Sequence, residues 1–157
     1  MLPFSLPEVW QDWLFDAGSL TARLTALSPE QFRVEVLAQY YGQATPVEQA
    51  EMGLGLNQKV WVREVKLLVA DEPLVYARTA IPVTTLTGKE KCLQALGNRS
   101  LGSYLFVQPN LKRGELRASR CAPNTLNLAW SRRSIFFLGD KPLLVSEAFS
   151  RKLLDFL

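Results

Sequence analysis

Two charged residues, Arg63 and Glu147, occupy positions where apolar side chains are expected, in a chain of 157 residues without histidine. Side chains two apart share a face of a strand, and every second residue from position 61 to 69 is apolar except Arg63. The same alternation from 143 to 149 is interrupted only by Glu147. Burying an unpaired ion costs several kcal/mol. We therefore expect a polar pocket inside a sheet-based core.

Two other readings of this pattern stay open at this stage. Arg63 and Glu147 could form a structural ion pair, or a β-bulge could shift the faces by one residue. A second cation, Arg78, follows the alternation of the next candidate strand, and a tight link at Asp71-Glu72 would bring it to the same face as Arg63. Two arginines against one glutamate favour an anionic ligand, because a guanidinium binds a carboxylate through two parallel hydrogen bonds.

Composition limits the chemistry that is possible. The length predicts one domain over residues 1–157, and 48% hydrophobic and 21% charged residues are typical of a soluble globular protein. The absence of histidine excludes histidine-based triads and histidine-ligated metals. Cys92 and Cys121 have no metal or redox spacing, so we expect reduced thiols and no metal. No membrane span or signal peptide is evident, which predicts a cytoplasmic protein.

Basic residues are concentrated between positions 112 and 133, where the chain has six of them and a single acidic residue, Glu115. They are Lys112, Arg113, Arg117, Arg120, Arg132 and Arg133. Such a stripe could bind nucleic acid through phosphates, steer a small dianion toward a cleft, or form a solvated strand face. Because no nucleic-acid-binding module accompanies it, we predict no nucleic-acid partner.

Local signals predict short helices and several strands. Capping residues predict helices after Ser5, Ser19 and Thr87, and a further turn from Ser100 to Phe106 whose first N–H groups could hold an anion. Residues 42–58 read as a mobile connection. Strands are expected near 31–40, 59–70, 73–81, 112–120, 126–138 and 142–149. This order predicts an α+β fold with a single antiparallel sheet of about six strands.

Several sequence blocks, in this order, resemble the chorismate lyase (chorismate pyruvate-lyase) family. They cover roughly residues 13–149 and include Trp61-Val-Arg-Glu64, Ala77-Arg-Thr79, Leu101-Gly-Ser-Tyr-Leu-Phe106, Trp130-Ser-Arg-Arg-Ser134 and Lys141-Pro-Leu-Leu-Val-Ser-Glu147. The resemblance implies a six-stranded antiparallel sheet with short helices and flaps over a buried ligand site. Ser103 departs from the family pattern, which has an arginine there, and residues 42–57 align poorly.

The resemblance also implies a function: a carbon–oxygen lyase that converts chorismate to 4-hydroxybenzoate and pyruvate, the first step of bacterial ubiquinone synthesis, without cofactor or metal. Arg63 would bind the ring carboxylate and Glu147 the ring hydroxyl, assisted by backbone amides of Leu20 and Leu101. We expect Arg78 to bind the enolpyruvyl carboxylate or to line its exit route. The implied enzyme is a cytoplasmic monomer subject to product inhibition. The alternative is a non-catalytic domain of the same fold that senses a small acid.

Overall fold

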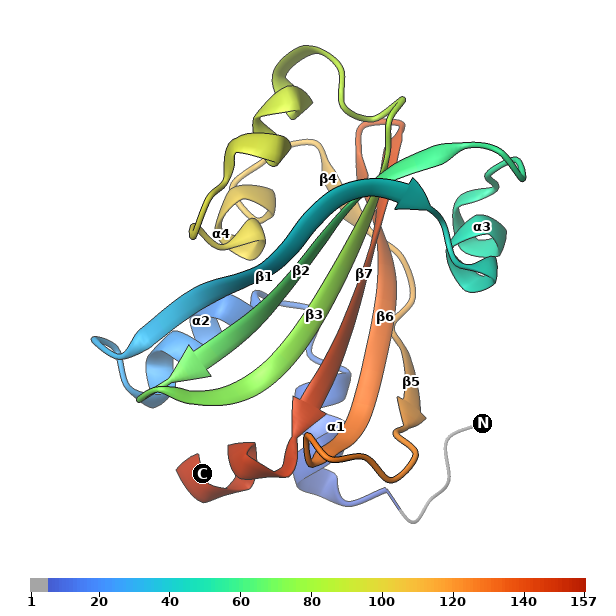
Figure 1. Ribbon diagram of the computed structural model, residues 1–157. Coiled ribbons are helices and arrows are strands. Elements are labelled where there is room, and N and C mark those ends of the chain that lie inside the picture. The colour runs from blue at the N-terminus through green and yellow to red at the C-terminus, as the bar shows by residue number, and fades with distance from the viewer. Residues whose placement is uncertain (1–5) are drawn as a thin grey trace.

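The computed structural model describes residues 6–157, which form one seven-stranded antiparallel sheet. The strands lie in the order β1, β2, β3, β7, β6 and β4, and β5 also pairs with β6 (Figure 1). Their bounds are β1 (Phe32–Gln43), β2 (Lys59–Val69), β3 (Glu72–Pro82), β4 (Leu111–Arg113), β5 (Arg117–Arg120), β6 (Leu128–Leu138) and β7 (Lys141–Ser150). The predicted α+β class with an antiparallel sheet is confirmed.

The sheet has one strand more than expected because the predicted strand near 112–120 is divided into β4 and β5. Both pieces pair with β6. Between them, Gly114 donates its N–H to the Ile135 carbonyl at 2.8 Å. A Cβ on Gly114 would lie 2.6 Å from the Ile135 side chain, so only glycine allows this close approach. The ladder with β6 is interrupted after Gly114 and resumes at Arg117.

The helices cover the sheet unequally. The face that carries Arg63 is covered by α1 (Glu8–Leu14), α2 (Leu20–Leu27), the 3-10 helix η1 (Gly88–Ala95) and α4 (Leu101–Leu105), whereas α3 (Pro46–Met52) lies against the other face (Figure 1). A last 3-10 helix, η2 (Arg151–Phe156), follows β7. Among residues 6–157, no helix is long and apolar enough to cross a membrane.

The helix starts follow local capping chemistry. Side-chain oxygens of Ser19 and Ser100 accept backbone N–H groups of α2 and α4, and Thr45 forms a full capping box with Glu48 at α3. The predicted cap at Ser5 lies outside the described residues. Pro7 stands at the N-cap of α1. The helix predicted after Thr87 is present as η1, with 3-10 geometry.

Two apolar clusters fill the covered face and leave a gap between them. The first joins α1 and α2 to the sheet through Trp10, Trp13, Leu14, Leu24 and Phe149. The second joins η1 and α4 to the opposite end of the same face through Leu93, Leu96, Leu105, Phe136 and Leu143. The polar side chains of the inward face lie between these clusters. Packing on both sides therefore determines where a pocket can exist.

The segment predicted only as a mobile connection contains α3, which is anchored by ion pairs. Arg78 on β3 donates to both carboxylate oxygens of Glu48, at 2.9 and 3.1 Å, and only 3% of the Glu48 side chain is exposed. Burial alone would raise the pKa of the Glu48 carboxyl, but hydrogen bonds from Arg78 and the Thr45 N–H lower it below its usual value. The charged form of Glu48 therefore stabilises the fold.

We expect Glu48→Gln to lower the free energy of unfolding by about 1–3 kcal/mol at neutral pH, because Arg78 loses a buried charged acceptor. Since folding lowers the pKa of Glu48, this contribution is present above the unfolded pKa of about 4.3 and is lost as the pH falls through the folded value. Denaturant unfolding of variant and wild type should therefore converge in acid. Glu64→Gln is the matched control, because Glu64 lies 3.5 Å from Arg78 but its side chain is 37% exposed. Equal effects of both substitutions would contradict the anchoring role of Glu48.

Candidate active site

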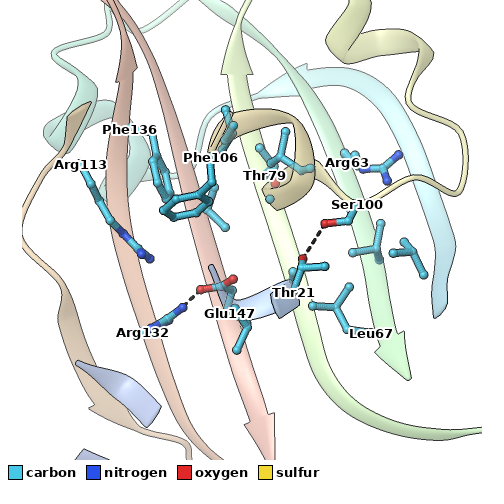
Figure 2. Close-up of a pocket in the computed structure, with 18 of the residues that line it drawn as sticks. Thr21, Arg63, Leu67, Thr79, Ser100, Phe106, Arg113, Arg132, Phe136 and Glu147 are labelled. Atoms are coloured by element: carbon cyan, nitrogen blue, oxygen red, sulfur yellow. Dashed lines mark hydrogen bonds and ion pairs between the residues drawn. The ribbon is translucent and has the colours of Figure 1, made fainter. Parts of the chain in front are cut away.

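A pocket lies on the helix-covered face of the sheet, between the two apolar clusters. Side chains of β1, β2, β3, β4, β6 and β7 contribute to it, together with the first residues of α2 and α4 (Figure 2). Two neighbouring rows of paired residues cross the sheet here: Arg63, Thr79, Val145 and Ser134 in one, and Val65, Ala77, Glu147 and Arg132 in the next. Arg63 and Glu147 both line the pocket, at different places along it.

Arg63 is 2% exposed and is held by backbone carbonyls rather than by a carboxylate. Its Nη1 donates to the Gly97 carbonyl at 2.9 Å and to Gln39 Oε1 at 3.4 Å, and its Nη2 donates to the Arg99 carbonyl at 2.8 Å. A guanidinium has five N–H groups, so the Nε–H and one Nη2–H have no acceptor within residues 6–157. These two N–H groups form the edge that binds a carboxylate side-on. Burial lowers the pKa of Arg63, as expected for a cation without a counter-ion.

Glu147 has a different partner, Arg132. The Arg132 Nε donates to Glu147 Oε1 at 2.8 Å, and the two side chains are 1% and 12% exposed. The Nη1 of Arg132 donates to the carbonyls of three residues that end α1 and follow it, Trp13, Leu14 and Asp16. The other carboxylate oxygen, Oε2, has no donor among the described residues. Arg132 thus fixes the Glu147 carboxylate while Oε2 stays free to accept a hydrogen bond.

The structural ion pair between Arg63 and Glu147, one of the two alternative readings, is absent from residues 6–157. Strand β3 separates the two residues, since Arg63 pairs with Thr79 and Glu147 pairs with Ala77. Two strand spacings of about 4.8 Å place the two backbones about 10 Å apart across the sheet. One residue is a cation without a carboxylate partner, and the other is half of a buried ion pair. The two charges therefore have separate surroundings.

The prediction that Arg78 shares a face with Arg63 is wrong. Arg78 pairs with Glu64, the neighbour of Arg63 on β2, so its side chain lies on the opposite face of the sheet. There it contacts Glu48, Glu64 and the Tyr40 hydroxyl. The hydrogen bond with Glu48 raises the pKa of Arg78 above its usual value. Arg78 therefore anchors α3 and does not line the pocket.

Arg113 enters the pocket from β4, opposite Arg63 (Figure 2). Its Nε donates to Ser134 Oγ at 3.0 Å, and its Nη1 donates to the carbonyls of Ala17 and Gly18 at 3.1 and 3.3 Å. The guanidinium also stacks over Phe136, 4.6 Å from the ring centre. Burial, together with the neighbouring charge of Arg132, lowers the pKa of Arg113 to about 10.

Leu20 and Leu101, which the resemblance implies as substrate-binding residues, lie at neighbouring helix starts. They are the first residues of α2 and α4, and both line the pocket. The hydroxyls of Thr21 and Ser100 lie 2.5 Å apart and join the two helix starts. Gly102 permits this approach, because a Cβ there would lie 3.0 Å from Thr21 Oγ1. The first N–H groups of a helix have no intrahelical acceptor, so both amides can donate to a ligand.

Arg113 and Arg132 are the pocket residues that sequence reasoning missed, because both were read only as members of the basic stripe. The signal for Arg132 was present: it interrupts the apolar alternation Trp130, Phe136 and Leu138 as Arg63 does in β2. The rest of the stripe lies elsewhere. Arg117 and Arg133 bind Glu51 of α3, and Arg120 stacks on Trp130. The stripe is thus divided between the two faces of the sheet.

The charge of the pocket suits a dianion. Three guanidinium groups and one carboxylate line it, which leaves two positive charges, and within residues 6–157 neither Arg63 nor Arg113 has a carboxylate partner. Apolar side chains such as Val34, Leu67 and Phe136 form much of the remaining wall. No three Cys, Asp or Glu side chains gather closely enough in the described part to hold a metal ion. The arrangement can bind a flat apolar ring with anionic substituents at separate places.

Comparison with known sequences gives a consistent result. Residues 3–155 match the family model described as chorismate lyase. A probable chorismate pyruvate-lyase of Marinobacter nauticus is 41% identical over 136 residues, which cover 86% of this chain and 72% of the relative. The probable chorismate pyruvate-lyase of Aromatoleum aromaticum is 39% identical, with 96% and 89% coverage. The chorismate pyruvate-lyase of Yersinia enterocolitica is 34% identical, with 94% and 84% coverage.

Solved structures with the same fold come from transcriptional regulators. The C-terminal domain of the histidine utilization repressor from Pseudomonas syringae pv. tomato aligns with a TM-score of 0.62 at 12% identity and covers 78% of this chain and 93% of that one. The effector domain of PhnF from Mycobacterium smegmatis aligns with a TM-score of 0.61 at 12% identity, with 86% and 90% coverage. At this identity the likeness concerns the fold alone.

Proposed function

The chain belongs to the chorismate lyase family, and we propose that it converts chorismate to 4-hydroxybenzoate and pyruvate in the pocket between α2, α4 and the sheet. It is a carbon–oxygen lyase, and the family acts at the first step of ubiquinone synthesis. One observation carries the assignment to this pocket. Two guanidinium groups without carboxylate partners, the buried Arg63 and the half-buried Arg113, face a cavity with an apolar wall. Chorismate is a cyclic dianion, so its charge and shape complement the cavity.

The ring of chorismate lies with its carboxylate at Arg63 and its hydroxyl at Glu147. The free Nε–H and Nη2–H edge of Arg63 binds the ring carboxylate in two parallel hydrogen bonds. The backbone N–H groups of Leu20 and Leu101 donate at the same end. At the other end, Glu147 Oε2 accepts a hydrogen bond from the ring hydroxyl, since Oε1 is already bound to Arg132. The separation of about 10 Å between the two strands leaves room for one six-membered ring.

The reaction needs positioning more than a nucleophile. The hydrogen on the ring carbon that bears the hydroxyl passes to the methylene carbon of the enolpyruvyl group. The carbon–oxygen bond of the ether breaks in the same step, the ring gains its third double bond, and the ether oxygen becomes the carbonyl of pyruvate. Atoms and electrons balance without a redox partner, and aromatisation provides driving force. The pocket contributes by holding a reactive conformer and stabilising the charge of the departing group.

Purified protein mixed with chorismate should yield 4-hydroxybenzoate and pyruvate in equal amounts, and a chelator should leave the rate unchanged. Both products can be followed by their absorbance and by coupled reduction of pyruvate. A reaction without protein measures the spontaneous decay of chorismate. Chorismate that stays intact beyond that background, or that is converted to a different product, would exclude this function.

The sensing alternative predicts tight binding of a small acid without turnover. The regulator domains share the fold at 12% identity, whereas the lyase relatives are 34–41% identical over most of the chain. The sequence relationship therefore supports the enzyme. The family resemblance further supports a cytoplasmic monomer with product inhibition and no nucleic-acid partner.

A further inference from the structure

Chorismate has a second carboxylate, on its enolpyruvyl group, that Arg63 and Glu147 leave without a partner. This carboxylate is lost with pyruvate, so 4-hydroxybenzoate does not carry it. A buried carboxylate without a cation would be costly. The pocket therefore needs a second cation near the hydroxyl end of the ring, because the ether carbon is adjacent to the carbon that bears the hydroxyl.

We propose that Arg113 binds the enolpyruvyl carboxylate and sets the conformation of that group, an inference that rests on the proposed function. Arg113 lies at the Glu147 end of the pocket, with its guanidinium turned toward Glu147 and Arg132 (Figure 2). Its Nε and Nη1 are held by Ser134, Ala17 and Gly18, which fixes the plane of the group. Its Nη2 has no acceptor among the described residues and is the nitrogen available to a ligand.

Arg132 is the nearest competitor for this role, but its charge is already compensated. Glu147 Oε1 accepts from it at 2.8 Å, whereas no carboxylate of residues 6–157 lies within ion-pair distance of Arg113. Burial and the Arg132 charge lower the pKa of Arg113, and the more distant carboxylates of Glu147 and Asp16 offset this only in part. Arg78, on the other face of the sheet, does not line the pocket. Arg113 therefore remains as the uncompensated cation at this end.

This role has a consequence for the reaction. The methylene carbon must lie against the hydrogen on the hydroxyl-bearing carbon, and rotation about the ether bonds would move it away. A cation that holds the enolpyruvyl carboxylate restricts that rotation and keeps the reacting atoms close. Arg113 is thus expected to affect turnover as well as substrate affinity, while leaving product affinity unchanged.

The test compares two unreactive aromatic ligands in Arg113→Gln and in wild type. One is 4-hydroxybenzoate, and the other is 3-(carboxymethoxy)-4-hydroxybenzoate, which keeps a second carboxylate beside the hydroxyl. Arg113→Gln should weaken the second ligand by about 30-fold or more, as for loss of a buried charge partner, and 4-hydroxybenzoate by less than about threefold. Lys112→Gln is the matched control, because Lys112 is exposed and adjacent in β4.

Equal losses for both ligands, or no loss for either, would overturn the assignment. If Arg113→Gln does not fold, a crystal structure of the wild-type protein with the carboxymethoxy ligand is the test. The second carboxylate of the ligand should then lie at Arg113 Nη2, and any other position would overturn the proposal. Placement at Arg132 would count against it. Wild type that binds neither ligand and leaves chorismate intact would refute the proposed function. Wild type that turns over chorismate but tolerates Arg113→Gln would refute only this inference.

Discussion

Arg63→Ala is expected to weaken binding of 4-hydroxybenzoate by about 3–5 kcal/mol, because the ring carboxylate would then be buried without its cation. The carbonyls of Gly97 and Arg99 would lose their donor as well, so negative partial charges would face the ligand. Chorismate turnover should fall with the affinity, since the ring would no longer be held against Glu147. Isothermal titration with 4-hydroxybenzoate and initial rates with chorismate measure the two effects.

Two further variants make the Arg63 result interpretable. Arg33→Ala removes a half-exposed arginine that pairs with Glu35 and Asp71, and it should change neither affinity nor rate. Arg63→Lys keeps the charge but cannot donate from a planar edge, so we expect an intermediate loss. Circular dichroism monitors the fold of each variant. Affinity near that of wild type in a folded Arg63→Ala protein would remove Arg63 from the site.

Glu147→Gln is expected to reduce chorismate turnover by about 10²–10³-fold, the usual cost of losing one charge-stabilising group in a closed site. It should also weaken 4-hydroxybenzoate, because a neutral amide accepts the hydroxyl proton less well than a carboxylate. Benzoate lacks the hydroxyl, so its affinity reports the contribution of all contacts other than those with the hydroxyl. We therefore expect the affinity for benzoate to change little, while the preference for 4-hydroxybenzoate over benzoate is lost. An unchanged preference would show that Glu147 does not meet the hydroxyl.

Glu147 also neutralises Arg132, so its replacement has a cost in stability. We expect Glu147→Gln to lower the free energy of unfolding by about 1–3 kcal/mol, since the buried guanidinium keeps its carbonyl acceptors but loses its counter-ion. Replacing both partners by apolar residues, Arg132→Met with Glu147→Leu, removes the unpaired charge but leaves the carbonyls of Trp13 and Leu14 without their donor. The double variant should therefore recover only part of the stability and none of the activity. Denaturant unfolding of the single and double variants separates the two roles. Recovery of activity in the double variant would contradict the role of the carboxylate.

The buried charges could be predicted because periodicity depends only on local backbone geometry. An extended strand places alternate side chains on opposite faces, so Arg63 and Glu147 were assigned to the core from spacing alone. The same reasoning applied to β6 would have found Arg132, where the basic stripe was read as a surface feature instead. Capping chemistry is similarly local, and it correctly predicted the starts of α2 and α4.

The error about Arg78 came from register, which is not local. A link at Asp71-Glu72 would pair Arg63 with Ala80 and place Arg78 on the pocket face. The turn instead uses Ala70 and Asp71, both with positive φ, and a bulge follows between Leu67 and Leu68. Arg63 consequently pairs with Thr79. A shift of one residue reverses every side chain of the strand, so this small difference moved Arg78 to the other face.

A second bulge, in β1 between Val36 and Ala38, has the same kind of effect on Gln39. Strict alternation from Phe32 would place Gln39 on the polar face and Tyr40 in the core. The bulge pairs Gln39 with Arg63 and leaves Tyr40 40% exposed on the side of Arg78. Gln39 Oε1 thereby becomes an acceptor for Arg63. The β1 bulge is not marked by glycine or proline, so nothing in the local sequence indicates it. Beside the bulge between β2 and β3, Leu68 pairs with Pro73.

The amino-acid sequence by itself therefore determined the fold class, the family and the two charges that must be buried, since these depend on spacing and on residue type. Only the tertiary structure decided which partners those charges have: backbone carbonyls for Arg63, and Arg132 for Glu147. It also showed that Arg113, and not Arg78, lines the pocket with Arg63. The physical reason is that the register of a strand pair depends on the turn that joins the strands and on every bulge between that turn and the site. A shift of one residue at any of these places changes which side chains meet.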